Sequence, residues 1–405
     1  MRILVVYRGL PWPIWEGYHL RILHLFRRLR ERHAVHLLSL LHEEGQDRHL
    51  PELEAEGLFA SIQTFRLPPR SRCRQLLDNL RGGGAESFRA QWPGFRSRLQ
   101  EAAQETVERT GAGVAYVFDP WADLWWGAVK PLPTLLDVCD CRTLYYERKL
   151  ERGGLGPRER LRTRQLRARF RRIETTLLGE YPLATVVSPA DREALLRLRP
   201  GCRVEVVPNG VDLEMFAPLP ETPEEPGHLV MFGNMDFEPN VDAAVRFARE
   251  MLPRVRERHP EARFTVLGSN PLPEVRALEE IPGVAVTGLV PELRPWLQRA
   301  VMLAAPMRLG AGLKNKVLEA LAMEKAVVTS PSAVEALHPE VARHVVLADP
   351  EDPAAFAAAV SAVLDDEAER RRRARAGRQA VAQHHSWEAA ARRYEELLAG
   401  LAGAQ

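Results

Sequence analysis

What this sequence lacks excludes several classes of protein. No apolar run reaches the roughly 20 residues that a membrane-spanning helix needs. The opening residues, MRILVVY, are typical of a strand and are followed by no cleavable signal pattern, so we expect a cytoplasmic protein. A formal net charge of only +2 gives no overall reason to expect nucleic acid as a partner.

Cysteine and lysine are both scarce. The cysteines have the spacing of neither a disulfide framework nor a zinc site, so we expect them to pack rather than bind metal: Cys73, Cys139, Cys141 and Cys202. Only five of the 56 basic residues are lysines: Lys130, Lys149, Lys314, Lys316 and Lys325. The last three lie close together in a chain that otherwise uses arginine, which indicates a site that needs a compact ammonium group.

The rest of the composition is that of an ordinary soluble protein, with 45% hydrophobic and 27% charged residues. Buried strands alternate with helical segments in the first half, at Ile3–Tyr7, Val35–Leu41, Ala60–Arg66, Val114–Phe118, Thr134–Val138, Val186–Ser188 and Arg203–Val207. The alternation returns in the second half, at Leu229–Phe232, Arg263–Leu267, Val284–Val286, Val301–Ala305, Ala326–Thr329 and Val345–Leu347. This pattern favours parallel sheets with helices on both faces.

The segment between the two halves is rich in proline and acidic residues and reads as a linker. We therefore predict an α/β protein with two doubly wound, Rossmann-like domains that face each other across a cleft. The predicted parts are residues 1–206, a linker at 207–228, residues 229–384 and a final helix at 385–405. In such sheets ligands bind beyond the carboxyl ends of the strands. The loop after the first strand lacks G-x-G-x-x-G, which excludes a nicotinamide fingerprint.

The strongest single pattern lies between Ala304 and Ser330. It predicts a buried strand, a loop that contains Gly310 and Gly312, a short helix and a second buried strand. Glycines let the backbone approach a ligand, and the start of a helix offers N–H groups and partial positive charge to a diphosphate.

Lys316 and Glu319 are three residues apart and share one face of that helix. Lysine can reach a phosphate, and the carboxylate can accept hydrogen bonds from ribose hydroxyls. The alternative is an exposed helical ion pair, which contributes only a few tenths of a kcal/mol.

This stretch resembles the donor-site signature of family 4 glycosyltransferases with the GT-B fold. There the signature ends in a glutamate, small or apolar residues and a Pro-Val-Val-like strand, as Glu319, Ala320–Ala322 and Ala326–Val328 do here. Ala311 stands where the family has an earlier glutamate. The loop G-x-G-x-x-N-K-V-L-E-A is similar to the variant in bacterial exopolysaccharide sugar transferases, including those associated with exosortase systems.

The resemblance implies transfer of a sugar from a nucleotide diphosphate donor to a saccharide or lipid-linked acceptor. It implies retention of anomeric configuration, no metal and no other cofactor, and a last helix that packs back on the first domain. The positions that match the family's donor site are Gly17, Gly233, Asn234, Gly288, Leu289, Gly310, Gly312, Leu313, Lys314, Lys316 and Glu319. Lys316 would also act in catalysis, by stabilising the departing diphosphate.

Some of these matches have plain structural alternatives. Gly233-Asn234 resembles the family's glycine turn, but asparagine there is also typical of a helix cap. Gly288-Leu289 fits either a loop that touches the base or a strand end stopped by Pro291. Residues 208–212, PNGVD, resemble the family's hinge motif.

On the acceptor side, Asp137 and Asp140 end a predicted strand and resemble a D-x-x-D stretch of the sugar-transferase subgroup. A carboxylate there could orient or deprotonate the acceptor hydroxyl. The alternative is that Asp140 caps the helix that follows. Asp119 and Asp123, which lie among tryptophans, are weaker candidates for lining the acceptor groove.

Residues 158–172 are densely basic with a compatible apolar stripe. The pattern indicates either peripheral contact with an anionic membrane or the solvated face of a core helix.

Two other functions compete with sugar transfer. A nucleotide-sugar epimerase can share the fold and needs only one substrate. A non-catalytic nucleotide-sugar-binding protein is favoured by Ala311 at the usual glutamate position.

Overall fold

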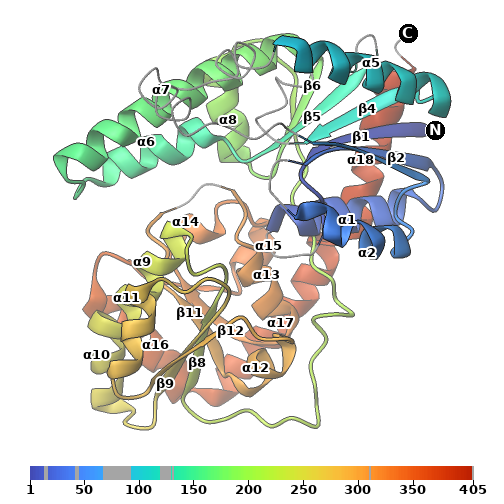
Figure 1. The fold of residues 1–405 in the computed structure, drawn as a ribbon. Coiled ribbons are helices and arrows are strands. Elements are labelled where there is room, and N and C mark those ends of the chain that lie inside the picture. Colours follow the sequence, from blue (N-terminus) through green and yellow to red (C-terminus); the bar gives the residue numbers. More distant parts are fainter. Residues whose placement is uncertain are drawn as a thin grey trace. The chain divides into compact units, whose positions relative to one another are not determined.

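The chain folds into two compact units (Figure 1). Unit 1 contains Met1–Val207 and Glu388–Gln405, and unit 2 contains Pro208–Trp387. The computed structural model describes residues 1–12, 17–41, 45–66, 93–118, 129, 132–309 and 312–403.

Unit 1 is built on a seven-stranded sheet in the order β3-β2-β1-β4-β5-β6-β7. The strands are β1 (Arg2–Arg8), β2 (Ala34–Leu41), β3 (Ser61–Arg66), β4 (Val114–Phe118), β5 (Thr134–Cys139), β6 (Leu183–Val186) and β7 (Val204–Val206). All neighbouring pairs are parallel. The central strand β4 is apolar and buried along its whole length, as expected where helices cover both faces.

The described helices of unit 1 precede, separate and follow these strands in the chain. They are α1 (Gly17–Leu29), η1 (Gln46–His49), α2 (Leu50–Ala55), α5 (Pro93–Thr110), α6 (Arg142–Arg152), α7 (Pro157–Glu180), α8 (Pro189–Leu198) and α18 (Trp387–Ala402). The last helix, α18, is part of unit 1 although more than half of the chain separates it from the strands it contacts.

Unit 2 has a six-stranded parallel sheet in the order β10-β9-β8-β11-β12-β13. The strands are β8 (His228–Phe232), β9 (Arg263–Leu267), β10 (Val284–Gly288), β11 (Met302–Ala305), β12 (Ala326–Thr329) and β13 (Val346–Leu347). The helices are α9 (Glu238–Arg246), η3 (Phe247–Met251), α10 (Leu252–Arg258), α11 (Pro273–Arg276), η4 (Ala277–Glu280), α12 (Arg294–Arg299), α13 (Asn315–Ala322), α14 (Pro331–Val334), α15 (Pro339–Ala342), α16 (Pro353–Asp365) and α17 (Glu367–His384).

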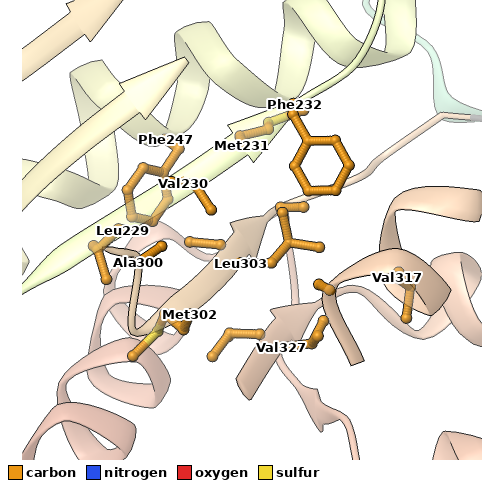
Figure 2. Close-up of a cluster of buried hydrophobic side chains, with 14 of the residues drawn as sticks. Leu229, Val230, Met231, Phe232, Phe247, Ala300, Met302, Leu303, Val317 and Val327 are labelled. Atoms are coloured by element: carbon orange, nitrogen blue, oxygen red, sulfur yellow. The ribbon is translucent and has the colours of Figure 1, made fainter. Parts of the chain in front are cut away.

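The core of unit 2 lies between the central strands and the helices that cover them. Figure 2 shows Leu303 of β11 and Val327 of β12 close to Val317 of α13. Val317, Leu318 and Leu321 are fully buried, so α13 is held against the sheet along one face. Its neighbouring polar residues therefore have fixed positions.

Both sheets have the strand order of doubly wound folds, so the predicted class of two Rossmann-like α/β domains is confirmed. The order reverses beside the first strand of each unit, at β1/β4 and at β8/β11. One prediction of detail is wrong. The sequence over Val241–Arg258 predicts one continuous helix, but the structure divides this segment into α9, a π-helical turn and α10. Pro253 in the first turn of α10 explains the break, because proline has no N–H and clashes with the preceding turn.

The two chain segments that connect the units are joined to each other within unit 2. The Val211 N–H donates to the His385 carbonyl at 2.9 Å, and Val211 pairs with Ser386 in a parallel bridge. A Cβ on Gly210 would lie 2.3 Å from the Trp387 nitrogen, so only glycine fits there. This is the environment of the PNGVD motif.

Candidate functional site

Three glycines line the carboxyl edge of the unit 2 sheet. Gly233 follows β8, Gly268 follows β9 and Gly288 ends β10, with φ of 143°, 149° and 70°. These backbone conformations favour glycine. The Gly233 N–H donates to the Leu267 carbonyl and the Gly268 N–H to the Gly288 carbonyl, both at 3.0 Å. A Cβ on Gly268 would lie 1.7 Å from the Gly233 carbonyl oxygen. The turns after β8, β9 and β10 therefore form one closely packed backbone surface at the edge where ligands bind in this class of sheet.

Asn234 and Asn240 brace the turn after β8. The Asn240 side-chain amide donates to the Asn234 carbonyl at 2.8 Å, and the Ser269 hydroxyl donates to Asn234 Oδ1 at 3.2 Å. Phe237, not an asparagine, occupies the cap position of α9. The alternative interpretation of Asn234 as a helix cap is therefore wrong. Its side chain instead links two strand-end turns.

Lys316 is the buried cation of this edge. Its side chain extends from the first turn of α13 to donate to Asn240 Oδ1 at 2.6 Å, and a Cβ on Gly233 would lie 3.3 Å from its Nζ. Among the residues that the structure describes, Asn240 is the only hydrogen-bond partner of the Lys316 ammonium. An ammonium has three donors, so two remain for a ligand.

The charge of Lys316 is poorly compensated. Burial, and then repulsion from Lys314, lower the pKa of Lys316 to about 7, although Glu319 opposes the shift. A buried cation with one neutral acceptor is unfavourable unless an anion joins it. The site therefore has the chemistry of an anion receptor.

Glu319 lies one turn further along α13 and is the only residue of that helix's second turn that is not fully buried. Burial raises the pKa of its carboxyl to about 7, and the nearby Lys316 lowers it only in part. Within the described part of the chain, no hydrogen bond or ion pair to this carboxylate is formed. Both carboxylate oxygens can accept hydrogen bonds from a ligand.

The start of α13 completes the site. Lys314 is the cap residue, with no side-chain hydrogen bond to the first turn, and Gly312 before it has φ of 68°. Asn315 is fixed from outside the helix, because its Oδ1 accepts from Asn209 Nδ2 at 3.0 Å. The sequence did not predict this contact, although Asn209 lies in the PNGVD motif. It orients the first turn of the helix that carries Lys316.

The structure thus brings several predicted residues to one edge of unit 2: Gly233, Asn234, Gly288, Gly312, Lys314, Lys316 and Glu319. Leu313 packs partly against the core. The side chain of Leu289 is 69% exposed. Gly310, like Ala311, lies outside the described residues. Gly17 begins α1 in unit 1.

Asp137 does not have the environment of a catalytic base. It is completely buried, and Oδ2 accepts hydrogen bonds from Arg21 Nε at 2.7 Å, Tyr116 at 2.6 Å and Tyr394 at 2.7 Å. This network joins α1, β4 and β5 to α18. The predicted role of Asp137 at the acceptor is corrected to that of a structural group that holds the last helix on unit 1.

Asp140 lies in a tightly held turn after β5. Cys139 has φ of 62°, which is rare for a residue other than glycine, and Cys141 is the cap residue of α6. The alternative interpretation, in which Asp140 caps this helix, is therefore wrong. Two buried carboxylates fix the turn: Asp191 accepts from the Cys141 N–H at 2.9 Å, and Glu174 accepts from the Arg142 N–H at 2.7 Å. Asp140 itself stays partly exposed.

The two weaker candidates for the acceptor groove, Asp119 and Asp123, lie outside the described residues. Across the described ranges, no cluster of three His, Cys, Asp or Glu side chains has the arrangement of a metal site. The described helices include none with the length and apolar character that crossing a bilayer requires.

The comparisons with known proteins agree with this arrangement. Residues 226–366 match the family model described as Glycosyl transferases group 1. Sucrose-phosphate synthase from Thermosynechococcus elongatus has a similar structure, with 18% identity, a TM-score of 0.72 and 100% of both chains covered. HepE from Anabaena, in complex with UDP and glucose, has 15% identity and a TM-score of 0.70, covering 99% of this chain and 100% of its own. No curated protein matches the chain significantly in sequence.

The family match lies within unit 2, and the structural similarity extends over both units. Together they confirm the predicted enzyme class, a glycosyltransferase with the GT-B fold. The assignments to family 4 and to exopolysaccharide synthesis stay predictions.

Proposed function

We propose that this enzyme takes its sugar from a nucleotide diphosphate donor that binds at the carboxyl edge of the unit 2 sheet. The observation that supports this most is the buried Lys316 ammonium beside a glycine turn, which donates to only one neutral partner among the residues that the structure describes. A diphosphate supplies the missing negative charge. The Glu319 carboxylate one turn away is suited to accept hydrogen bonds from ribose hydroxyls.

The proposed mechanism is electrostatic. As the bond from the sugar to the diphosphate breaks, negative charge develops on the departing phosphate oxygen. Lys316 and the first N–H groups of α13 stabilise that charge, and they are already in place because Asn240 and Asn209 hold them. Such pre-organised donors contribute without reorganising during the reaction.

For the finer assignments we propose a saccharide or lipid-linked saccharide acceptor, retention of configuration, and no requirement for metal or another cofactor. The loop G-x-G-x-x-N-K-V-L-E-A supports the link to cell-surface polysaccharide synthesis. Structures of HepE in complex with UDP and with UDP-glucose make uridine donors the first to test. Anomeric NMR of the product tests retention, and turnover in the presence of a chelator tests metal independence.

A donor assay with and without acceptor tests the proposed function. Release of nucleoside diphosphate that depends on a saccharide acceptor is the expected result. Formation of a stereoisomer from the donor alone would instead identify a nucleotide-sugar epimerase. Donor binding without either reaction would identify a non-catalytic binding protein.

The affinity for nucleoside diphosphate is expected to be greatest near pH 7 and to fall on both sides. Diphosphate favours protonated Lys316, whose pKa is about 7 in the free enzyme, so affinity is lost as the pH rises above that value. Ribose hydroxyls favour ionised Glu319, whose pKa is also about 7, so affinity is lost as the pH falls below it. Calorimetric titration from about pH 5.5 to 9 measures the affinity on both sides of this maximum. An affinity that does not change with pH would contradict the assignment of Lys316 and Glu319 to the donor site.

Replacing Asp140 with asparagine is expected to lower kcat by about 100-fold while leaving donor affinity unchanged, because general acid–base groups contribute rates of this order. The partly exposed carboxylate in a rigid turn is what motivates the test. Asp137→Asn is the matched comparison and is expected to lower the melting temperature, because it weakens the partner of buried Arg21. Full activity in Asp140→Asn would remove this residue from the acceptor side.

A further inference from the structure

The helical hairpin formed by α6 and α7 is strongly basic, unlike the rest of the chain. Its two helices contain twelve arginines and lysines against five acidic residues, a net charge of +7, whereas the whole protein has +2. The remainder of the chain is therefore net negative. In Figure 1, α7 runs alongside α6, and it also contacts α8.

Most of this charge is not neutralised within the protein. Seven arginine side chains of α7 form no hydrogen bond or ion pair with any residue that the structure describes: Arg158, Arg160, Arg162, Arg164, Arg167, Arg171 and Arg172. The first four are exposed, in a part of the helix where every residue from 157 to 162 is exposed. They are not needed to pack the helix.

The other arginine-rich helix, α17, is built differently. Arg371 pairs with Glu367 at 2.6 Å, and Glu369 pairs with Arg372 at 2.7 Å and with Arg373 at 3.2 Å. These partners are three or four residues away on the same helix, the spacing at which opposite charges stabilise it. An arginine run in this chain can therefore be self-neutralised, and the run in α7 is not.

The spacing of the arginines within α7 destabilises this helix when no partner is bound. Arg158 and Arg162 are four residues apart, as are Arg160 and Arg164, and like charges at this spacing repel. An anionic surface removes that penalty when it binds. The charge pattern therefore points to a partner of opposite sign.

The surface chemistry favours lipid over nucleic acid. Leu161 is 58% exposed between Arg160 and Arg162, and an apolar side chain among arginines is suited to the boundary between lipid headgroups and acyl chains. The aromatic rings of the hairpin instead stack on one another, with Tyr146 and Phe170 centroids 5.6 Å apart. They provide no stacking platform for exposed bases.

We propose that the α6–α7 hairpin binds the surface of a membrane rich in anionic lipid, through the exposed arginines of α7. The contact is electrostatic, with Leu161 entering the headgroup layer. It is independent of the donor site, which lies in unit 2.

Sedimentation with vesicles tests this proposal on the full chain. Binding is expected to vesicles of phosphatidylcholine with about 30% phosphatidylglycerol and not to phosphatidylcholine alone, and it should weaken steeply with added salt. The triple variant Arg160→Gln, Arg162→Gln, Arg164→Gln is expected to bind about 100-fold more weakly, because each charge near such a surface contributes roughly fivefold. Its melting temperature should not fall, since repelling charges are removed.

The matched control is Arg371→Gln, Arg372→Gln, Arg375→Gln in α17, which changes the net charge equally at exposed positions. It is expected to retain vesicle binding. Absence of binding by the unchanged protein, or equal loss in both triple variants, would overturn the proposal. Retention on single-stranded DNA or heparin that depends on the α7 arginines, without vesicle binding, would also overturn it in favour of a soluble polyanion.

Discussion

Replacing Lys316 with methionine is expected to weaken nucleoside diphosphate binding about 100-fold and to lower kcat by a further 100-fold or more. A charge-assisted hydrogen bond contributes about 1.5–3 kcal/mol to binding. Loss of one pre-organised donor at a developing negative charge costs about 2.7–4 kcal/mol in the transition state. Methionine keeps the length and burial of the side chain, so the change isolates the ammonium. Calorimetry and steady-state kinetics measure the two effects.

The chain offers a matched control for this prediction in Lys325. It is also a buried lysine, but its Nζ donates to Glu224 at 2.7 Å and to the Gln298 carbonyl at 3.0 Å. Lys325→Met should therefore lower the melting temperature and leave donor affinity unchanged. Lys316→Met should instead weaken donor binding and raise the melting temperature, because it removes a buried charge that the free protein compensates poorly. A lower melting temperature with normal donor affinity in Lys316→Met would make this lysine structural.

The second large effect is expected from Gly268→Ala, which should destabilise unit 2 by about 3 kcal/mol or more. The added Cβ would lie 1.7 Å from the Gly233 carbonyl oxygen, and φ of 149° is unfavourable for alanine. The turn after β8 must then shift, so donor affinity should fall as well. A loss of this size corresponds to roughly 6–12 °C in melting temperature.

Gly113→Ala is the control for Gly268→Ala, since a Cβ there meets nothing within 4 Å. It should be neutral or slightly stabilising, because alanine restricts the unfolded chain more than glycine does. Equal stability and donor affinity in Gly268→Ala and Gly113→Ala would show that the turns after β8, β9 and β10 are not closely packed.

The sequence was sufficient to predict the α/β class and the strand-loop-helix that carries Lys316 and Glu319. Continuous apolar strands and a glycine loop are local signals, so they can be recognised without knowing the contacts. The β12 strand over Ala326–Thr329 and α13 over Asn315–Ala322 lie close to where they were expected. The boundaries of longer elements do not follow from the local pattern alone, as the π-turn between α9 and α10 shows.

The errors concern contacts between distant parts of the chain. Asp137 resembled a catalytic carboxylate because its partners, Arg21 and Tyr394, are 116 and 257 residues away. The hydrogen bond from Lys316 to Asn240 spans 76 residues. Cys141 as a helix cap could not be expected, because oxygen-bearing side chains usually take that position. Local sequence patterns are enough to locate the candidate site. The polar groups that hold its side chains in place come from distant parts of the chain, so only the fold shows them.

The most direct test compares a nucleoside with its diphosphate as ligands for the unchanged enzyme and for Lys316→Met. The base is first chosen from a panel of nucleoside diphosphates by tightest binding. The two phosphates are expected to improve affinity at least 100-fold in the unchanged enzyme, and most of this gain is expected to disappear in Lys316→Met. An equal gain in both proteins would show that the diphosphate binds elsewhere and would contradict the assignment of this site.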